Sequence, residues 1–357
     1  MAISMDETTF RIIETLSNEI GRGITINALT EKVGQNYGSA YYANIYNKLK
    51  QIEKENIVTL KKAGSIIWIS LNFREYAILD RLTEMELKKK RTFLKDRIEM
   101  QILLMELEKK CRKLGFVKSI SLIDPVRNSK LNRAEFLFLV HGKSELSTSE
   151  RETKPLATIM KLLRSIHNMK IDYLIMTQAV FLNLLSSSEY NPAREMLASK
   201  IAAYNPQDFW NEIQTSSEEG RPARVIEETS PPKMSEQDLV YNMTRFGYSE
   251  MGTKITRAKD FCLEHVVSAM ITRGDARRIE AVPVLLAKNV VNYDLLVFLS
   301  EKFGFSDKLL GLVKVLAEIA PKKELENAVR IMEERKIEES PADKNSVAEK
   351  MRLYNAT

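Results

Sequence analysis

The first 71 residues carry the pattern that most restricts the fold: three short amphipathic segments followed by two β-type runs. Apolar residues recur at helical spacing, and Asp6 and Thr25 stand where N-caps are expected. Ala63 and Gly64 form a suitable tight turn between the two runs. The expected elements are helices over 6–20, after Thr25 and over about 39–55, a turn over 34–38, and strands over 58–62 and 65–71.

The stretch ITINALTEKVGQNYGSAYYANIYNKLKQIEKENIVTLKKAGSIIWISL resembles the winged helix-turn-helix family. The resemblance implies that the third helix enters the major groove of DNA and that the hairpin touches the backbone. Asparagine fits adenine edges, while tyrosine, serine and lysine reach phosphates. The implied DNA-binding residues are Asn36, Tyr37, Ser39, Tyr41, Tyr42, Asn44, Asn47, Lys48, Lys50, Lys61 and Lys62. Some of these tyrosines must pack inward, and winged helices also bind proteins, so a protein-docking role stays open.

Residues 74–115 are expected to connect this domain to the next. They contain no Gly or Pro before Gly115, which predicts one long helix or two abutting helices. The basic run over 88–91 is read as a solvated face or as a source of extra phosphate contacts. The apolar positions expected to dock on the next domain are Ile98, Ile102, Leu103, Met105 and Leu107.

Residues 116–214 alternate between strand-like and helix-like patterns. Strands are expected over 117–123, 134–140 and 171–176, and helices over 152–168 and after Thr177. The alternation predicts a small α/β domain with a mixed sheet.

This region resembles the minimal nucleotidyltransferase fold of the polymerase-beta superfamily, chiefly at KIDYLIMTQAVFLNLLSSS and NPAREMLASKIAAYNPQDFW. Members carry a Gly-Ser turn, two acids on one strand and a third acid on a later strand, and these carboxylates hold divalent metal for phosphoryl transfer. Here Asp124 and Pro125 replace the Gly-Ser turn, Glu135 alone remains of the acidic pair, and Asp172 takes the third position. The resemblance therefore implies a degenerate active site, with Glu135 and Asp172 as a vestigial metal or nucleotide site. An unrelated α/β fold stays open.

The basic side chains beside this site, Arg127, Lys130 and Arg133, are expected to lie in a solvated loop. A retained nucleotide or nucleic-acid site is the alternative.

Residues 215–236 are polar and rich in Pro, Ser and Glu, which predicts a mobile linker. A helical domain is expected over 237–336, and residues 337–357 are expected to form a loosely ordered tail. The helices expected there span 251–274, 275–289 with Asp275 as cap, 291–304, 306–320 and 322–336.

Several classes of function lack their signals. No apolar run reaches about 18 residues, and the first residues do not form a secretory signal, so a cytoplasmic protein without membrane contact is expected. Cys111 and Cys262 have no CxxC partner and are read as buried thiols. The three histidines, 141, 167 and 265, are out of helical reach of one another. Since phosphate-binding loops are absent too, we expect no metal, no cofactor and no enzymatic activity.

These observations predict a multidomain α+β protein: an N-terminal winged helix, a central nucleotidyltransferase-like domain and a C-terminal helical bundle. A net charge of +6 suits a polyanionic partner. The expected function is duplex-DNA binding in a transcriptional regulator, as a homodimer because paired half-sites multiply affinity. The alternatives are an antitoxin-like or scaffold protein that grips a protein partner, and a metal-dependent nucleotidyltransferase.

Overall fold

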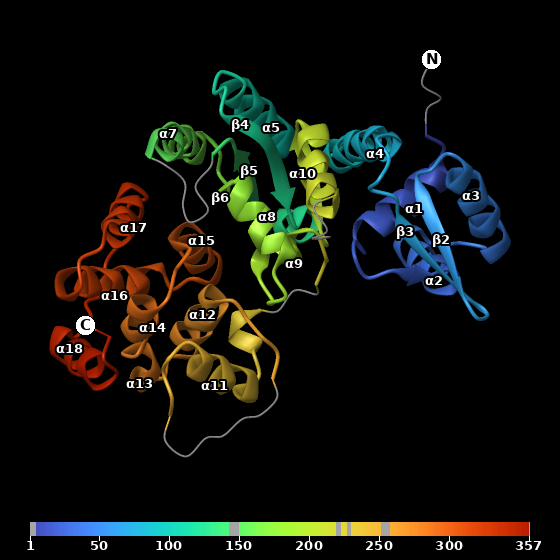
Figure 1. Ribbon diagram of the computed structural model, residues 1–357. Coiled ribbons are helices and arrows are strands. Elements are labelled where there is room, and N and C mark those ends of the chain that lie inside the picture. Colours follow the sequence, from blue (N-terminus) through green and yellow to red (C-terminus); the bar gives the residue numbers. More distant parts are fainter. Residues whose placement is uncertain (1–4, 143–149, 219–222, 227–229, 251–257, 357) are drawn as a thin grey trace.

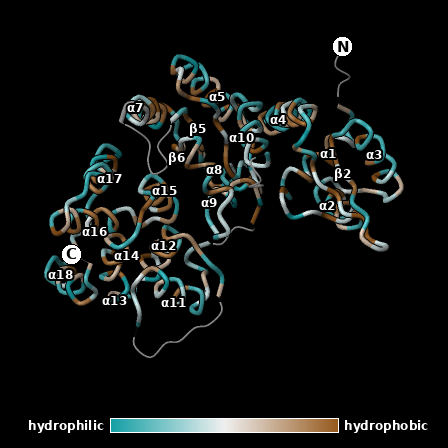
Figure 2. The backbone as a smooth tube through the Cα atoms, viewed as in Figure 1, coloured by the Kyte–Doolittle hydropathy of each residue, from teal (hydrophilic) through white to brown (hydrophobic). Residues whose placement is uncertain are grey.

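The computed structural model describes residues 5–142, 150–218, 223–226, 230–250 and 258–356 and is an α+β structure. In Figure 1 the elements form three groups along the chain: α1–α3 with a hairpin, a four-stranded sheet with its helices, and the C-terminal helices. Hydrophobic and hydrophilic positions alternate along the helices in Figure 2, as expected for helices with one buried face. No helix within the described ranges combines the length and apolar character needed to cross a membrane.

The N-terminal unit (residues 5–73) contains the helices and the hairpin that the sequence predicts. Its elements are α1 (Glu7–Ser17), β1 (Ile24–Thr25), α2 (Ile26–Tyr37), α3 (Tyr42–Lys54), β2 (Val58–Ala63) and β3 (Ile66–Leu71). The strands form an antiparallel sheet in the order β1-β3-β2, in which β1 is an addition that the sequence did not suggest. Both expected N-caps are confirmed: Asp6 accepts from the Thr9 N–H and Thr25 from the Ala28 N–H.

The turn between the second and third helices lies later than the sequence predicts. Helix α2 continues through Gly34 to Tyr37 and ends at Gly38, whose φ of 91° suits a glycine. Helix α3 therefore starts at Tyr42. The expectation that residues 34–38 form the turn is wrong for residues 34–37, because a single glycine inside a helix did not end it.

The connector consists of two abutting helices, α4 (Ala77–Leu94) and α5 (Ile98–Cys111). The docked face of α5 is formed by Met100, Leu103, Leu104, Leu107 and Cys111. Two of the residues expected to dock, Leu103 and Leu107, belong to it. The other three lie on the opposite face and are exposed: Ile98, Ile102 and Met105.

The central sheet has the order β6-β5-β4-β7. Its strands are β4 (Val117–Ile123), β5 (Arg133–Val140), β6 (Lys170–Thr177) and β7 (Lys200–Tyr204). Strand β4 is antiparallel to β5 and β7, whereas β5 and β6 are parallel, so the sheet is mixed as predicted. Its helices are α6 (Pro125–Lys130), α7 (Glu150–Ile166), α8 (Gln178–Ser186), α9 (Pro192–Met196) and α10 (Pro206–Glu218). Helices α5 and α7 share a hydrophobic core with one face of the sheet, and α8 and α10 share a second core with the other.

The prediction of a mobile linker over 215–236 is wrong for the residues that the structure describes. Helix α10 continues to Glu218, and Ala223, Val225 and Ile226 are buried. The Val225 N–H donates to the carbonyl oxygen of Ile20 at 2.9 Å, so this segment binds the N-terminal unit. Composition misled here because a polar stretch with a few apolar residues can still pack along a surface.

The C-terminal helices follow a short 3-10 turn, η1 (Pro231–Lys233). They are α11 (Glu236–Arg245), α12 (Leu263–Arg273), α13 (Ala276–Ile279), α14 (Val282–Lys288), α15 (Tyr293–Phe303), α16 (Ser306–Ile319), α17 (Lys323–Glu334) and α18 (Lys344–Leu353).

Two helices expected in this region are shorter than the sequence predicts. Helix α12 begins only at Leu263, because Phe261 forms a bridge with Tyr190; the part of the expected helix over 251–257 lies outside the described residues. The helix expected over 275–289 is divided into α13 and α14 by Pro283 near the start of α14, although Asp275 caps α13 as predicted.

The expectation of a loose C-terminal tail is also wrong. Residues 344–353 form α18, whose Val347 and Met351 are buried against α14 and α16. The Tyr354 hydroxyl donates to the carbonyl oxygen of Ser249 at 2.9 Å. Asp343 caps α18 by accepting from the Asn345 N–H, so the sequence does contain a helix start signal at this point.

The approach of this tail to α16 predicts the effect of Gly311→Ala. Alanine favours a helix over glycine by roughly 1 kcal/mol. A Cβ at position 311, however, would overlap the carbonyl oxygen of Ser340 and lie 3.4 Å from the Ala342 nitrogen. We expect the overlap to dominate and Gly311→Ala to lower the free energy of unfolding by about 1–3 kcal/mol in urea titrations.

The matched control is Gly34→Ala, also within a helix, where a Cβ would lie 3.8 Å from its nearest neighbour, the Ala40 nitrogen. This change should be neutral or stabilising. Equal effects of the two substitutions would contradict the close packing of residues 340–342 on α16.

Candidate functional site

The outward face of α3 is polar and unoccupied by other elements. Helix α3 buries Ile45, Leu49 and Ile52, which fixes the direction of the remaining side chains. Asn44 and Asn47 are exposed, and neither amide has a hydrogen-bond partner among the described residues. Two asparagines one turn apart on an exposed helix can each offer a donor and an acceptor to a ligand.

Tyrosines surround the start of α3. Tyr41 is 71% exposed, and Tyr42 is 49% exposed and stacks on Tyr46 with ring centroids 6.2 Å apart. Tyr37 differs, because its hydroxyl donates to Glu14 and its ring packs edge-on against Phe10. Tyr37 is thus a packing residue that joins α2 to α1.

Two further residues of the expected DNA-binding set lie at the end of α2 and just before the start of α3. Asn36 and Ser39 are both exposed, the first in the last turn of α2 and the second in the turn before α3.

The lysines of α3 are held by neighbours to different degrees. Lys48 contacts Asp6 at 3.0 Å; burial opposes ionisation of Asp6, but hydrogen bonds from Thr9 and Lys48 outweigh it and lower the pKa of Asp6 to about 2. Lys50 is exposed and pairs with Glu53 on its own helix at 2.9 Å. Lys54 has no ion pair among the described residues. Lys48 therefore ties α3 to the cap of α1, whereas Lys50 and Lys54 remain accessible.

The hairpin lies next to α3, and β2 contacts that helix directly. Lys61 and Lys62 near its tip are exposed and have no acidic partner in the described parts of the chain. On β3, Ile66 and Trp68 are 47% and 41% exposed. In Figure 1 the hairpin extends beyond the helices of the N-terminal unit, which leaves its tip accessible.

The basic run on α4 is not a solvated face. Three consecutive lysines, 88–90, bind other elements; their partners are Glu7 on α1, the carbonyl oxygen of Lys200 on β7, and Glu108 on α5. The last residue of the run, Arg91, is exposed. The reading of this run as a solvated face is wrong for the three lysines, because α4 lies between two units that each supply acceptors.

The two carboxylates expected at the vestigial site do lie together. Glu135 on β5 and Asp172 on β6 are register partners in the parallel pair and are only 1% exposed. Between them lies the guanidinium of Arg133, whose Nε is 3.1 Å from Glu135 and 2.7 Å from Asp172. Arg133 is therefore not part of a solvated loop: its position on β5 directs it to the same face of the sheet as Glu135. The other two basic residues expected there, Arg127 and Lys130, are exposed on α6.

Helix α15 covers this site. Its Lys302 ammonium is 3.4 Å from Glu135, and the Lys302 carbonyl oxygen accepts from Arg133 at 3.3 Å. Arg164 and Lys170 approach Asp172 at 3.8 and 3.9 Å. Two further acids pair with these cations, because Asp124 lies 3.9 Å from Lys302 and Glu301 lies 3.4 Å from Arg164.

This arrangement does not fit a divalent metal. A metal needs free carboxylate oxygens about 2.0–2.6 Å away, whereas Arg133 occupies the space between the two acids. Within the described residues no group of three or more His, Cys, Asp or Glu side chains has the arrangement of a metal site. Glu135 and Asp172 instead bind a guanidinium and help attach α15 to the sheet.

A second buried cluster joins α9 to α12. The Cys262 sulfur is 3.3 Å from His265 Nδ1, and His265 Nε2 is 3.2 Å from Glu195. Both Cys262 and His265 are buried, which confirms the reading of Cys262 as a buried thiol. Burial raises the pKa of Cys262 well above its usual value, so the sulfur is a protonated thiol and a poor nucleophile. Sequence gave no signal for Glu195, because the contact depends on how two distant helices pack.

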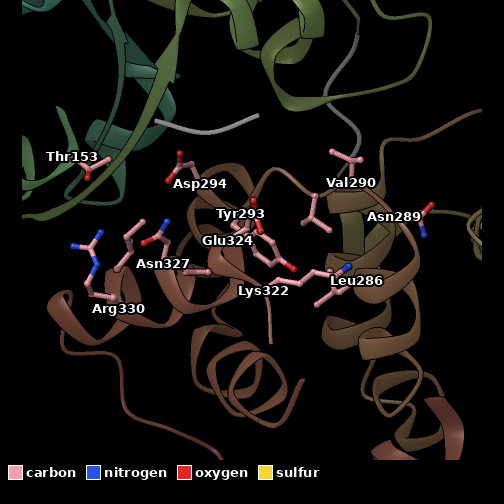
Figure 3. A pocket seen from close by; sticks show the side chains of 13 residues that line it. Thr153, Leu286, Asn289, Val290, Tyr293, Asp294, Lys322, Glu324, Asn327 and Arg330 are labelled. Carbon is pink, nitrogen blue, oxygen red and sulfur yellow. The ribbon is translucent and has the colours of Figure 1, made fainter. Parts of the chain in front are cut away.

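The pocket in Figure 3 lies between α7 and the helices α14, α15 and α17, and has a volume of about 200 Å³. Its lining carries charges of both signs, from Asp294, Glu324, Lys322 and Arg330. It is smaller than most small-molecule sites, which span roughly 300–1,000 Å³. The pocket favours no particular class of ligand.

Comparison with known proteins adds no relatives. The sequence matches no protein-family model, and searches of curated proteins and of solved structures found no match.

Proposed function

We propose that this protein binds duplex DNA through α3 and the β2–β3 hairpin. The observation that carries the proposal is the outward face of α3, where Asn44 and Asn47 are exposed without internal partners. Asparagine can form two hydrogen bonds with adenine in the major groove, which is wide enough to admit a helix. The order of helices and hairpin supports a winged-helix interpretation of the N-terminal unit.

Phosphate contacts would come from both sides of this face. Residues 36–62 contain five lysines and two glutamates, so the surface attracts a polyanion. Lys61 and Lys62 are free to reach one stretch of backbone, and Lys50 and Lys54 another. The hydroxyl groups of Tyr41 and Tyr42, at the start of α3, can donate hydrogen bonds to phosphate.

In this proposal the central and C-terminal elements have regulatory roles and do not contact DNA. The order β4, short α6, β5 with Glu135, and β6 with Asp172 supports a degenerate nucleotidyltransferase-like domain. With Arg133 between the acids, that domain acts as a scaffold on which the C-terminal helices pack. We propose a transcriptional regulator that works as a homodimer, in which these parts mediate oligomerisation and the binding of a partner or ligand.

The proposal is tested by fluorescence anisotropy of the purified chain on random duplex DNA across a salt series. Wild-type affinity should fall steeply with salt, because binding to DNA releases counterions. The double substitution Lys61→Ala/Lys62→Ala should weaken binding to every sequence and reduce the salt slope by about 2, since each lost phosphate contact removes ~0.9.

The matched control removes two other exposed lysines, Lys308→Ala/Lys323→Ala, which change the net charge equally but lie on α16 and α17. Its salt slope should equal that of the wild type. Absence of binding at low salt would refute the proposal, and equal slopes for the two double variants would refute the role of the hairpin.

The second candidate function is protein docking through the same unit. Exposed Ile66 and Trp68 on β3 favour it, because apolar side chains at a surface are typical of protein interfaces. This alternative would be supported if the chain co-purified with a stoichiometric protein partner and showed no affinity for DNA itself.

A further inference from the structure

Helix α5 presents an apolar stripe to solvent. Ile98, Ile102 and Met105 are 70%, 46% and 62% exposed. Their spacing of four and three residues places them on one side of the helix, opposite the buried residues Leu103 and Leu107. Large apolar side chains arranged in a row at the surface indicate a contact surface more strongly than the same residues scattered singly.

The end of α7 lies beside α5. His167, just after α7, lies 3.3 Å from Glu106 of α5, which places the two helices side by side at that point. The preceding turn exposes Leu162 and Ile166, at 43% and 55%. We call these five residues, Ile98, Ile102, Met105, Leu162 and Ile166, the α5–α7 apolar face.

Within α5 the first turn is acidic and the last turn is basic. Glu99 lies in the first turn, and Lys109 lies in the last turn on the same side as Ile102. Neither has an ion-pair partner among the described residues. An exposed helix with an acid at one end, apolar residues in the middle and a base at the other end complements an antiparallel copy of itself.

The register of such a pair follows from the spacing. A two-fold axis between Leu103 and Leu104 places Ile102 against Met105 of the second copy. The same axis brings Lys109 next to Ile98 and Glu99 of the second copy. A parallel pair would instead place like charges together. A two-fold interface repeats each of these contacts, as self-complementary surfaces require.

We propose that the α5–α7 apolar face is the contact surface of a homodimer in which the two α5 helices lie antiparallel. The occupant is a second copy of this chain, selected by the opposite charges at the ends of α5. The proposed interface does not depend on whether the protein binds DNA. If the proposed DNA binding also holds, the dimer would present two α3 helices to paired half-sites.

Sedimentation velocity of the full chain without DNA tests this inference. The wild type should sediment as a dimer at micromolar concentration. Ile102→Glu should raise the dissociation constant at least ~100-fold, since it places a charge in the apolar centre twice per dimer. The control Leu353→Glu alters another exposed apolar residue, 67% exposed at the end of α18, and should leave the dimer unchanged.

Charge exchange tests the antiparallel register. Glu99→Lys and Lys109→Glu should each weaken the dimer about 10-fold, because each creates two like-charge contacts. The double variant restores opposite charges and should recover most of the wild-type affinity. A monomeric wild type, a dimer unaffected by Ile102→Glu, or a double variant no tighter than either single variant would overturn the proposal. Each result is obtained without DNA, so failure here is distinguishable from failure of DNA binding.

Discussion

Arg133→Met is expected to destabilise the protein by about 3 kcal/mol or more, among the largest effects of any single substitution considered. The side chain of methionine fills similar space but leaves Glu135 and Asp172 without the guanidinium between them. These carboxylates are almost fully buried, and their remaining cations are 3.4–3.9 Å away. Arg133 also donates to the carbonyl oxygen of Lys302, so the substitution should loosen α15 from the sheet.

Urea unfolding followed by circular dichroism gives the free-energy difference. The control is the triple variant Arg133→Met/Glu135→Gln/Asp172→Asn, which removes the buried charges together and should recover much of the loss. If the free energy of unfolding of Arg133→Met lies within about 0.5 kcal/mol of the wild-type value, as is usual for surface substitutions, the bridging role of Arg133 is refuted.

The N-terminal unit could be predicted because its signals are local. Asp6 and Thr25 cap the helices that follow them, and the apolar residues Ile45, Leu49 and Ile52 recur at helical spacing and are buried. The error at Gly34 arose because a glycine costs a helix only about 1 kcal/mol, which packing of α2 against α1 and α3 can offset.

The carboxylate site could be predicted only in part. The strands holding Glu135 and Asp172 were recognisable from their apolar runs, and these two residues are neighbours as the resemblance implied. The role of Arg133 was missed because it depends on strand register and on the position of α15. Both are set by contacts between residues far apart in sequence.

The linker and the tail show why composition alone is a weak guide at the ends of domains. The stretch over 215–236 and α18 are polar overall, yet Val225, Val347 and Met351 are buried. A few apolar side chains suffice where neighbouring elements already provide a surface. On α5 the prediction failed in the opposite direction: Ile98, Ile102 and Met105 were expected to be buried and are exposed. Apolar spacing on a helix does not say which side faces the core.

Lys200→Met is expected to remove a large pH dependence from the stability of the protein. Lys200 lies where β7 meets α4 and α10, and its ammonium donates to the Leu197 carbonyl oxygen at 3.0 Å and lies 4.5 Å from the ring of Trp210. Burial lowers its pKa to about 7, against the opposing effect of Glu86 and with a smaller contribution from Lys89. Since the unfolded chain keeps a normal lysine, the two states bind different numbers of protons between pH 7 and about 10.4.

In this interval the unfolded state carries the extra proton, so the contribution of Lys200 to stability rises with pH. It is lost as the pH falls towards 7, where the buried amine also becomes protonated, and the full change is on the order of 5 kcal/mol. The free energies of unfolding of the wild type and Lys200→Met, measured at pH 7, 8 and 9, should therefore diverge by roughly 1 kcal/mol per pH unit in favour of the wild type. Subtraction cancels the other groups that titrate in this range, and Lys308→Met, at an exposed position, should give a curve parallel to the wild type. A parallel curve for Lys200→Met as well would mean that this amine keeps its proton when buried, and that Glu86 and the Trp210 ring stabilise the charge more than burial opposes it.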